Sequence, residues 1–392
     1  MNITPYHIIH TTISPCDHER RIFNEVISAE KEDYHVKILA LKTPGLPEKD
    51  RFRQTDIFRI SIKHWAGSPL KFLSFNWKLF LQLRKEKFVI LHVHDLWVLP
   101  ASVIAAIIFQ KPVIYDVHEY ARGLEIFKKK KISGLLWKFS EKIFIRFVQG
   151  IVVINKYHGK LISNDHFNIP EPVILMNFPS LEENNKNYLN DFAHRDNLAI
   201  YQGILKEDRG LKRIIESMLS VKSGCLKIVG YGELENELKE LVNNFNLQEK
   251  INFGGKISWD ELYPETSMAR AGLVLFEPEG LNYTYASPNK FFEYVHAGTP
   301  VIASSIASFD NLVREYKVGL LVNHNSVSEI TEAVEKLQTK KEIWDNFHKE
   351  CLKARQVWNW EQQEEKLLSI YQDLILKYQA AGQGFSHFEN SV

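Results

Sequence analysis

The chain alternates short runs rich in β-branched residues with longer amphipathic stretches, and this alternation is the feature that most constrains its fold. Such a pattern is typical of βαβ units, in which a helix returns the chain between two parallel strands. It therefore predicts an α/β protein with mainly parallel sheets. In chain order, the predicted strands are YHIIHT, HVKILAL, DIFRISI, FVILHVH, PVIYDVH, GIVVIN and PVILMN in the front half, and LAIYQG, LKIVG, KINFGG, GLVLFE, PVIASS and VGLLVN in the back half.

A polar, Asn-rich segment over residues 180–197 separates the two sets of strands and contains too little apolar material for a core element. We therefore expect two Rossmann-like domains, residues 1–180 and 181–360, facing each other across a cleft where ligands bind. The 392 residues suit two domains of ordinary size. Residues 361–392 are predicted to form a long helix that crosses back to the N-terminal domain, followed by a frayed tail.

Composition and the longest apolar run narrow the class of protein. With 45% hydrophobic and 25% charged residues, the chain has the composition of a soluble globular protein. Cys16, Cys225 and Cys351 lie far apart without a CxxC spacing, which favours neither a disulfide framework nor a zinc cage. The first residues lack the pattern of a signal peptide, and the apolar run over 98–109 is too short to cross a bilayer. We expect a cytoplasmic protein.

The formal net charge of +1 conceals an asymmetry between the two halves. Residues 1–180 carry 26 Lys and Arg against 17 Asp and Glu, which leaves 23 against 31 for the rest. Two basic amphipathic segments of the front half, 68–87 and 126–147, are of the kind that lies on anionic membranes. The sequence thus predicts a peripheral protein on the inner face of the membrane, and the alternative is ordinary helices with solvated lysines.

The segment SPNKFFEYVHAGTPVIAS, residues 287–304, predicts a helix whose N-terminus binds an anion. Ser287 is a good N-cap, and Pro288 suits the first helical position. The amides of Asn289 and Lys290, the helix dipole and the Lys290 ammonium would together favour a phosphate. Glu293 shares their face and could accept hydrogen bonds from sugar hydroxyls beyond the phosphate.

A second strand-to-helix junction, YQGILKEDRGLKRIIES over residues 201–217, opens the back domain. Gly203 ends the predicted strand, and Arg209 in the following loop could bind a diphosphate with two parallel hydrogen bonds. Gly230 and Gly232 in VGYGE mark a third strand end, but they do not complete a GxGxxG dinucleotide fingerprint.

Polar residues also follow two predicted strands of the front domain. His118 and Glu119 follow one of them, where the histidine could contact a substrate hydroxyl or carry a proton. His92 and His94 share one face of another strand, while Asp95 points away, and no further ligand stands at a clear spacing. The sequence therefore predicts no metal site there.

In the order and spacing of its motifs, nearly the whole chain resembles the family 4 retaining glycosyltransferases, which have the GT-B fold. The motifs that carry the resemblance are DHERRIFNE, PVIYDVHE, YQGILKEDRG, LKIVGYGE, INFGGKI, SPNKFFEYVHAGTPVIAS and WNWEQQEEKLLSIY. The resemblance implies transfer of a sugar from a nucleotide-sugar donor, with a UDP-sugar favoured, to a saccharide or lipid-linked saccharide in cell-surface polysaccharide assembly. It implies donor binding in the back domain and acceptor binding in the front domain.

The resemblance also assigns roles to individual residues. Arg209 matches the cation that binds the donor diphosphate, Glu293 the ribose-binding carboxylate, and His118 the strand-end histidine of the front domain. Lys256 and Ile257 align with the loop that holds the base. We expect catalysis by Arg209, Lys290 and His118; the donor set adds Gly203, Ser287 and Asn289, and the acceptor set adds Asp17 and Glu119.

No cofactor and no metal are expected for this reaction. The chain has no Asp-x-Asp motif, and cations with helix-end amides aimed at the diphosphate would strengthen as charge develops on the leaving group. The transition state of glycosyl transfer resembles an oxocarbenium ion. In the retaining reaction that the resemblance implies, the leaving phosphate itself can take the acceptor proton.

Two departures from the family pattern leave alternatives open. Ile204 stands where the family has an Arg after the first glycine, and Tyr285 stands where the first Glu of the Glu-x7-Glu pair is usual. A GT-B epimerase and a non-catalytic nucleotide-sugar-binding scaffold are therefore alternatives. The absence of GxGxxG disfavours a dehydrogenase, and the near-neutral charge disfavours nucleic-acid binding.

Overall fold

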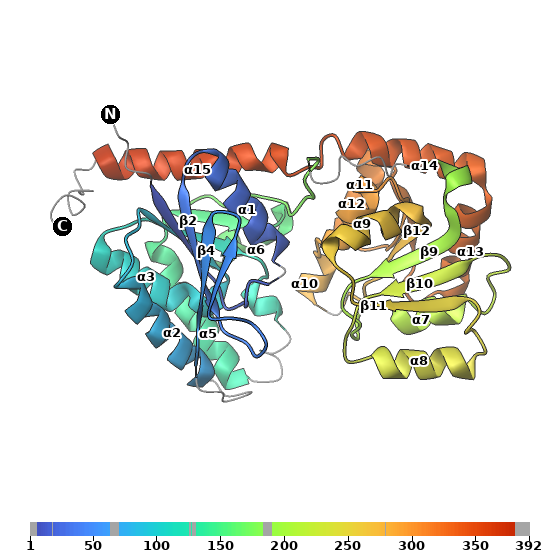
Figure 1. The fold of residues 1–392 in the computed structure, drawn as a ribbon, viewed down its shortest axis with the longest axis horizontal. Helices are drawn as coiled ribbons and strands as arrows, with labels where there is room; N and C mark the ends of the chain where they lie inside the picture. Colours follow the sequence, from blue (N-terminus) through green and yellow to red (C-terminus); the bar gives the residue numbers. More distant parts are fainter. Residues whose placement is uncertain are drawn as a thin grey trace. The chain divides into compact units, whose positions relative to one another are not determined.

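The computed structural model describes residues 6–17, 19–62, 70–124, 127, 131–182, 190–278 and 280–380, except the side chain of Trp259. The chain divides into two compact units, which are described separately (Figure 1). Unit 1 comprises residues 1–176 with 363–392, and unit 2 comprises residues 177–362. The division thus falls shortly before the predicted boundary at 180, and the predicted tail over 381–392 lies outside the described residues.

Unit 1 is built on an eight-stranded sheet with the order β3-β4-β2-β1-β5-β6-β7-β8. All neighbouring strands are parallel except β3 and β4. The central strands are buried on both faces, which explains their continuous apolar runs. The strands are β1 (His7–Thr11), β2 (His35–Leu41), β3 (Lys49–Phe52), β4 (Thr55–Ile60), β5 (Ile90–His94), β6 (Val113–Val117), β7 (Gly150–Val153) and β8 (Val173–Ile174).

Helices cover both faces of this sheet (Figure 1). Helix α3 packs against α2 and α5 on one face, while α1 and α15 lie on the other. Helix α15 adds the end of the chain to unit 1, since its Tyr371 is buried against His92 and Tyr34. The helices are α1 (Arg20–Lys31), α2 (Leu70–Leu83), α3 (Leu99–Phe109), α5 (Lys131–Phe144), α6 (Lys156–Asp165) and α15 (Glu361–Ala380).

Unit 2 contains a six-stranded parallel sheet with the order β11-β10-β9-β12-β13-β14. This order, 3-2-1-4-5-6 within the unit, is that of the Rossmann fold, in which ligands bind where the strand order reverses. The reversal lies between β9 and β12. The strands are β9 (Asp196–Gln202), β10 (Cys225–Val229), β11 (Ile251–Gly255), β12 (Ala269–Val274), β13 (Val301–Ser304) and β14 (Gly319–Val322).

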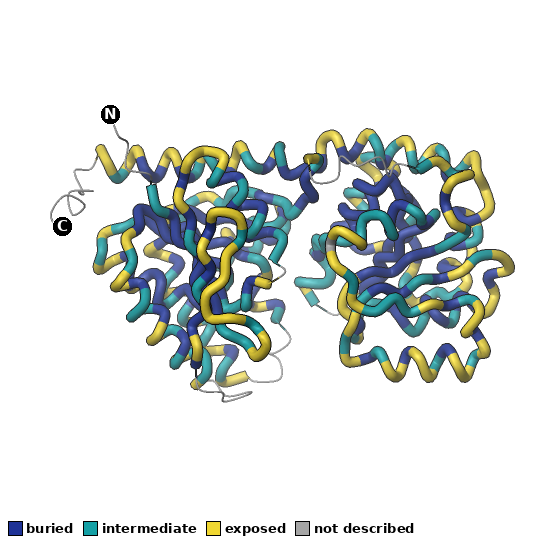
Figure 2. Tube along the Cα trace, in the orientation of Figure 1, coloured by how far each residue is buried: buried dark blue, intermediate teal, exposed yellow. Residues whose placement is uncertain are grey.

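The helices of unit 2 also form two layers. Helix α7 packs against α8 and α13, and α11 packs against α9 and α14. Figure 2 shows buried strands at the centre of each unit and exposed helix faces around them. The helices are α7 (Leu211–Ser217), α8 (Glu235–Asn244), α9 (Trp259–Met268), α10 (Leu281–Thr284), α11 (Asn289–His296), α12 (Ala307–Tyr316), α13 (Val327–Thr339) and α14 (Lys341–Ala354).

The predicted fold class is confirmed in both units: every strand predicted from the sequence is present. The prediction missed β3, because its sequence KDRF is charged and exposed and pairs only at the sheet edge. No described helix is both long enough and apolar enough to span a bilayer.

Candidate functional site

The candidate donor residues of unit 2 gather where the strand order reverses. Gly203 follows β9 directly, and Arg209 lies in the loop between β9 and α7. Phe276 follows β12, and the Arg209 guanidinium lies over its ring at 4.1 Å from the centroid. Residues after neighbouring parallel strands meet at one sheet edge, so the fold brings these loops together.

Two glycines explain why the loops after β9 and β10 lie so close. A Cβ on Gly230 would approach the Gly203 carbonyl oxygen to 1.9 Å, and one on Gly232 would approach the Leu205 carbonyl oxygen to 2.1 Å. The amides of Gly203 and Leu205 donate to the carbonyls of Val229 and Tyr231. The VGYGE glycines therefore permit a close backbone contact that supports the first loop.

Lys290, in the first turn of α11, extends to Gly203. Its Nζ lies over the Tyr201 ring at 3.7 Å from the centroid, and a Cβ on Gly203 would come within 3.1 Å of it. Among the described residues, Lys290 forms no ion pair. Burial, together with the nearby charge of Arg209, lowers the pKa of Lys290 well below its usual range, while Glu293 opposes this shift. The Lys290 ammonium thus lies near the positive charge of Arg209 at this edge of the sheet.

Glu293 lies one turn further along α11 and is 8% exposed. Its carboxylate accepts a hydrogen bond from the side-chain amide of Gln202, the last residue of β9. The side-chain oxygen of Gln202, Oε1, in turn accepts a hydrogen bond from Thr266 Oγ1 at 2.8 Å. This chain of contacts fixes the carboxylate at the sheet edge, beside the Lys290 ammonium.

Helix α11 begins one residue later than the sequence predicted. Pro288 is the N-cap, with extended backbone, and Asn289 is the first helical residue. The expectation that Ser287 caps the helix was therefore wrong, because the Ser287 side chain precedes the capping position; its Oγ is buried and has no hydrogen-bond partner in the described chain. The side chain of Asn289 accepts a hydrogen bond from Asn177 at 2.7 Å.

The other two candidate donor residues lie further along the same edge. Lys256 and Ile257 follow β11, and Lys256 Nζ lies over the Tyr231 ring at 5.1 Å from the centroid. The Gly230 amide donates to Gly255 just before them. The loop after β11 therefore contacts the β10 loop, and the contacts of the described residues do not join Lys256 directly to Lys290.

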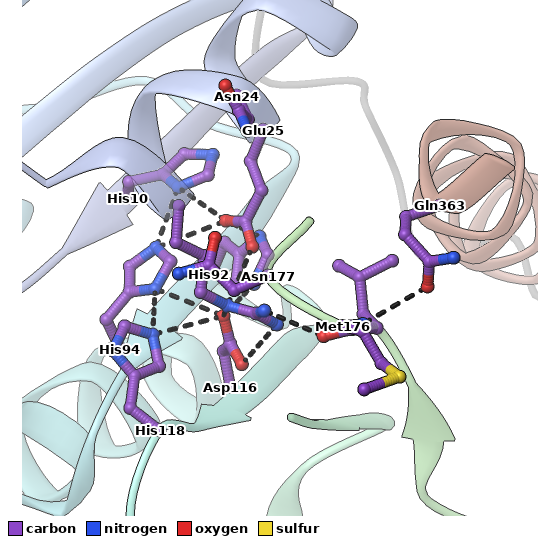
Figure 3. Close-up of polar contacts among 12 residues, drawn as sticks. His10, Asn24, Glu25, His92, His94, Asp116, His118, Met176, Asn177 and Gln363 are labelled. Atoms are coloured by element: carbon purple, nitrogen blue, oxygen red, sulfur yellow. Dashed lines mark hydrogen bonds and ion pairs between the residues drawn. The ribbon is translucent and has the colours of Figure 1, made fainter. Parts of the chain in front are cut away.

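In unit 1, His118 lies after β6 within a polar network (Figure 3). Its Nε2 is 3.2 Å from Asp116 Oδ2 and 3.1 Å from His94 Nδ1. Arg21 of α1 binds the Asp116 carboxylate with two hydrogen bonds of 2.7 and 2.9 Å. Asp95 contacts the other side of the ring, with Oδ2 at 3.6 Å from Nδ1. The side chains of His118 and Asp95 are 21% and 26% exposed, whereas that of Asp116 is fully buried, so His118 and Asp95 are accessible members of this network.

The neighbouring carboxylates determine the charge of His118. Burial alone would lower its pKa, but Asp95 and Asp116 outweigh burial and raise the pKa of His118 to about 9. Arg21 overcomes the effect of burial at Asp116 and holds the pKa of that carboxyl well below its usual range. At neutral pH His118 is an imidazolium that donates hydrogen bonds, and it cannot take a proton there.

Asp17 and Glu119 are exposed at the same edge of the unit 1 sheet. Asp17 lies between β1 and α1, and Glu119 directly follows His118.

Sequence reasoning missed three residues of the two sites: Gln202, Tyr201 and Arg21. The position of Gln202 directly before Gly203 was a usable signal, whereas nothing in the sequence links Arg21 to Asp116.

Two family models match the chain, one for each half. The model described as Glycosyltransferase Family 4 matches residues 18–175, and the model described as Glycosyl transferases group 1 matches residues 183–354. The two matches follow the division between the units and together cover most of the described residues.

Curated relatives agree with these matches. An uncharacterized glycosyltransferase of Methanocaldococcus jannaschii is 22% identical over 384 residues, covering 88% of this chain and 92% of the relative. The GDP-mannose-dependent alpha-(1-6)-phosphatidylinositol monomannoside mannosyltransferase of Mycobacterium tuberculosis is 29% identical over 124 residues, which are 30% of this chain and 31% of the relative.

Solved structures share the fold. Sucrose-phosphate synthase from Thermosynechococcus elongatus superposes with a TM-score of 0.75 at 16% identity, covering 95% of this chain and 100% of that chain. Anabaena HepE in complex with UDP-glucose superposes with a TM-score of 0.70 at 12% identity, covering 94% and 99%.

Proposed function

Because this chain belongs to the family 4 glycosyltransferases, which have the GT-B fold, we propose that it transfers a sugar from a nucleotide-sugar donor to a saccharide acceptor with retention of configuration. One observation carries the assignment of the donor site: Arg209 and the Lys290 ammonium lie near each other, beside the buried Glu293 carboxylate, where the strand order of unit 2 reverses. A nucleotide diphosphate is an anion, and cations at such an edge would bind it.

The electrostatics of Lys290 support diphosphate binding. A half-buried, charged lysine near an arginine is unfavourable without an anion, and desolvation together with the Arg209 charge accordingly lowers the pKa of Lys290. A diphosphate between the two cations would remove that penalty and restore the charged form of Lys290. The amides of Asn289 and Lys290 at the start of α11 would add hydrogen bonds to the same phosphate oxygens.

We assign the remaining donor contacts by chemistry. Glu293, fixed by Gln202, would accept hydrogen bonds from the ribose hydroxyls. Gly203 leaves room for the donor beside Lys290, and the backbone of Lys256 and Ile257 would hold the base. Ser287 remains a candidate donor contact, since its buried hydroxyl has no partner within the described ranges.

Catalysis follows from the same cations. As the glycosidic bond breaks, negative charge grows on the leaving diphosphate, and preorganised cations stabilise that charge more strongly than they stabilise the ground state. Arg209 and Lys290 would take this role, so the proposed reaction is independent of a metal ion and of a cofactor. His118, as an imidazolium, would donate a hydrogen bond to the acceptor, with Asp17 and Glu119 as further acceptor contacts.

For the substrates, we favour a UDP-sugar and a lipid-linked saccharide in cell-surface polysaccharide assembly. HepE binds UDP-glucose, which supports a UDP donor, whereas the mycobacterial relative is named for GDP-mannose. The same relative is named for a phosphatidylinositol acceptor, which supports a lipid-linked acceptor here. Donor identity is therefore the first quantity to measure.

The surface of unit 1 also supports a lipid-linked acceptor. Neighbouring helices α2, α3 and α5 expose large apolar side chains, which we call the apolar face: Leu73, Trp77, Ile104, Ile107, Ile108, Ile132, Leu135, Leu136 and Phe139. Ile132 is 81% exposed, and large apolar side chains that are exposed together mark an interaction surface. Exposed Lys131, Lys142 and Arg146 flank these residues, so we propose that the apolar face rests on an anionic membrane surface.

The function is tested with a panel of UDP-, GDP- and dTDP-sugars, with and without lipid extract, by measuring free nucleotide and the glycosylated product. We expect nucleotide release from one donor class that increases when lipid extract supplies the acceptor. Tight nucleotide binding without release from any donor would overturn the proposal in favour of a scaffold, and epimerised sugar without transfer would overturn it in favour of an epimerase.

Membrane docking is tested by vesicle flotation. We expect the protein to float with anionic vesicles at low salt and to be released at high salt, because screening weakens the lysine contribution. Replacing Leu135→Glu together with Phe139→Glu should abolish flotation. As a matched control, Leu376→Glu changes an exposed leucine of α15 outside the apolar face and should leave flotation intact. No flotation of the wild-type protein at any salt would refute this docking.

A further inference from the structure

Three histidines and one glutamate converge in the interior of unit 1 (Figure 3). His10 lies on β1, His92 and His94 lie on the neighbouring β5, and Glu25 lies on α1. All four side chains are completely buried. The sequence predicted no metal site because His92 and His94 showed no further ligand, but the fold supplies His10 and Glu25 from elsewhere in the chain.

The candidate ligand atoms of this cluster all lie within 4.8 Å of one another. His10 Nδ1 lies 2.8 Å from His94 Nε2. Glu25 Oε2 lies 3.6 Å from His94 Nε2 and 3.8 Å from both His10 Nδ1 and His92 Nδ1. Zinc binds nitrogen and oxygen at about 2.0–2.2 Å, which places tetrahedral ligand atoms about 3.3 Å apart. Shifts of a few tenths of an ångström would therefore suffice to bind an ion.

Hydrogen bonds within the described residues leave several buried polar atoms of this cluster without a hydrogen-bond partner. Neither carboxylate oxygen of Glu25 accepts a hydrogen bond from the described residues, and the nearest arginine nitrogen, Arg21 Nε, is 3.3 Å away and bonded to Asp116. A buried carboxylate that accepts no hydrogen bond is rare and unfavourable, even with an ion pair to Arg21 beside it. The metal-free alternative is a protonated Glu25, since burial and the adjacent Asp116 raise its pKa.

The outer nitrogens of His10 and His94 lie near oxygen atoms, whereas that of His92 has no hydrogen-bond partner among the described residues. His94 Nδ1 lies 3.4 Å from Asp116 Oδ2, His92 Nε2 lies 3.9 Å from the same oxygen, and His10 Nε2 lies 3.4 Å from the Tyr371 hydroxyl. Metal-bound histidines usually direct their second N–H at a carboxylate or another oxygen, which fixes the tautomer. Arg21 holds Asp116 with two hydrogen bonds, so this carboxylate is fixed in place beside the histidines.

We propose that His10 Nδ1, His92 Nδ1, His94 Nε2 and Glu25 Oε2 bind one Zn²⁺ ion that cross-links β1, β5 and α1. Neutral imidazoles with one carboxylate suit this metal better than Ca²⁺ or Mg²⁺, which prefer oxygen ligands. Binding would break the 2.7 Å contact between His92 Nδ1 and the Tyr371 hydroxyl. The Nδ1–H of His94 would then point at Asp116, and this carboxylate, which also contacts His118, would join the ion to the network of His118.

An overlapping arrangement of His94, Asp116 and His118 is a weaker candidate. Both Asp116 oxygens bind Arg21, so an ion there would compete with the guanidinium and face the His118 imidazolium. The Glu25 cluster belongs to unit 1 and contains none of the candidate donor residues, so the proposal stands whether or not the proposed sugar transfer is correct.

The test uses the full chain, produced in zinc-supplemented medium, stripped with a chelator and then titrated with Zn²⁺ in competition with a chromophoric chelator. We expect one zinc per chain in the purified protein, and a visible spectrum typical of tetrahedral coordination when Co²⁺ replaces it. Removing the metal should lower the melting temperature. A folded wild-type protein that neither contains nor takes up zinc would overturn the proposal.

Variants locate the ion. Glu25→Gln keeps the side-chain volume and should weaken zinc binding by about a hundredfold or more, as should His94→Gln. His35→Gln, an exposed histidine on β2 of the same sheet, is the matched control and should bind zinc as the wild type does. If either ligand variant does not fold, the Co²⁺ spectrum of the wild type still decides the coordination. Zinc uptake unchanged in a folded Glu25→Gln variant would place the ion elsewhere and overturn the assignment.

Discussion

At the scale of single residues, Lys290 indicates an anion-binding site, because its surroundings disfavour its positive charge in the free protein. The ammonium is packed over Tyr201, close to Arg209, and the fold does not supply a carboxylate in contact with it within the described ranges. Such an arrangement costs stability in the free protein and is compensated when an anion binds. Strain of this kind is expected at a binding site and not in a purely structural core.

Lys290→Met tests this interpretation. The folded state disfavours the charged lysine, so the variant should be at least as stable as the wild type in urea unfolding, while turnover with the preferred donor falls about 100- to 1,000-fold. The matched control is Lys239→Met, which removes an exposed ion pair with Glu235 and a contact with the Phe253 ring at 5.7 Å, and which should change stability by less than about 0.5 kcal/mol and leave turnover intact. Wild-type turnover in Lys290→Met would refute the role of this residue.

His118 gives a prediction for pH dependence. Its pKa in the folded protein, about 9, lies above its ordinary value of 6.5, so its stabilising contribution is complete below about pH 6.5 and is lost as the pH rises through 9. Wild-type stability should therefore fall across this window, by on the order of 2 kcal/mol from this group. Urea unfolding at pH 6 and pH 9 measures the effect.

The comparison variant is His118→Asn, which cannot become charged and should show a flatter pH dependence over the same window. Parallel curves for the two proteins would mean that Asp95 and Asp116 do not raise the pKa of His118 as the contacts indicate.

At the scale of elements, α15 is the most instructive helix, because it completes unit 1 from the far end of the chain. Leu367 and Tyr371 are completely buried, whereas Leu376 on the same helix is 63% exposed. Leu367→Ala should lower the free energy of unfolding by about 2–5 kcal/mol, through lost burial and a residual cavity. Leu376→Ala should change it by less than about 0.5 kcal/mol. Equal effects of the two substitutions in urea unfolding would contradict the packing of α15 on unit 1.

The elements also show where a sequence pattern is a reliable guide. Buried parallel strands are continuous apolar runs, so every central strand could be identified from its residues. The edge strand β3 could not, because its charged residues face solvent and only pairing with β4 keeps it extended. The start of α11 was predicted one residue early, since Ser-Pro at a helix start is compatible with two capping registers.

At the scale of the whole molecule, the two units differ in how the chain builds them. Unit 2 is a continuous segment, 177–362, whereas unit 1 needs residues 363–392 in addition to 1–176. We expect a fragment of residues 177–362 to unfold cooperatively and to bind the nucleotide of the preferred donor, since the candidate donor residues all lie within it. Circular dichroism on heating and calorimetric titration with the nucleotide measure both properties.

The corresponding fragment 1–176 should not fold stably, because it lacks Tyr371, which donates to or accepts from His92 in the core, and the buried Leu367 and Leu374. Adding a peptide of residues 361–380 should restore part of its structure. A stably folded 1–176 fragment would show that α15 contributes little to unit 1.

The sequence by itself determined the fold class, placed the division of the chain near the one observed and supplied the candidate donor residues, whose roles stay a prediction. It could do so because strand periodicity and glycine positions are local properties of the chain, and family motifs are short stretches. Gly203, Arg209, Lys290 and Glu293 each stand in such a stretch.

Only the tertiary structure decided which of these residues meet. The hydrogen bond between Gln202 and Glu293 joins positions 91 residues apart, and that between Arg21 and Asp116 joins positions 95 residues apart. The convergence of His10, Glu25 and His94 likewise depends on the pairing of β1 with β5 and on the placement of α1. Contacts of this kind follow from strand order and from burial, which local sequence does not encode, and they set the charges on which the proposed chemistry and the zinc site depend.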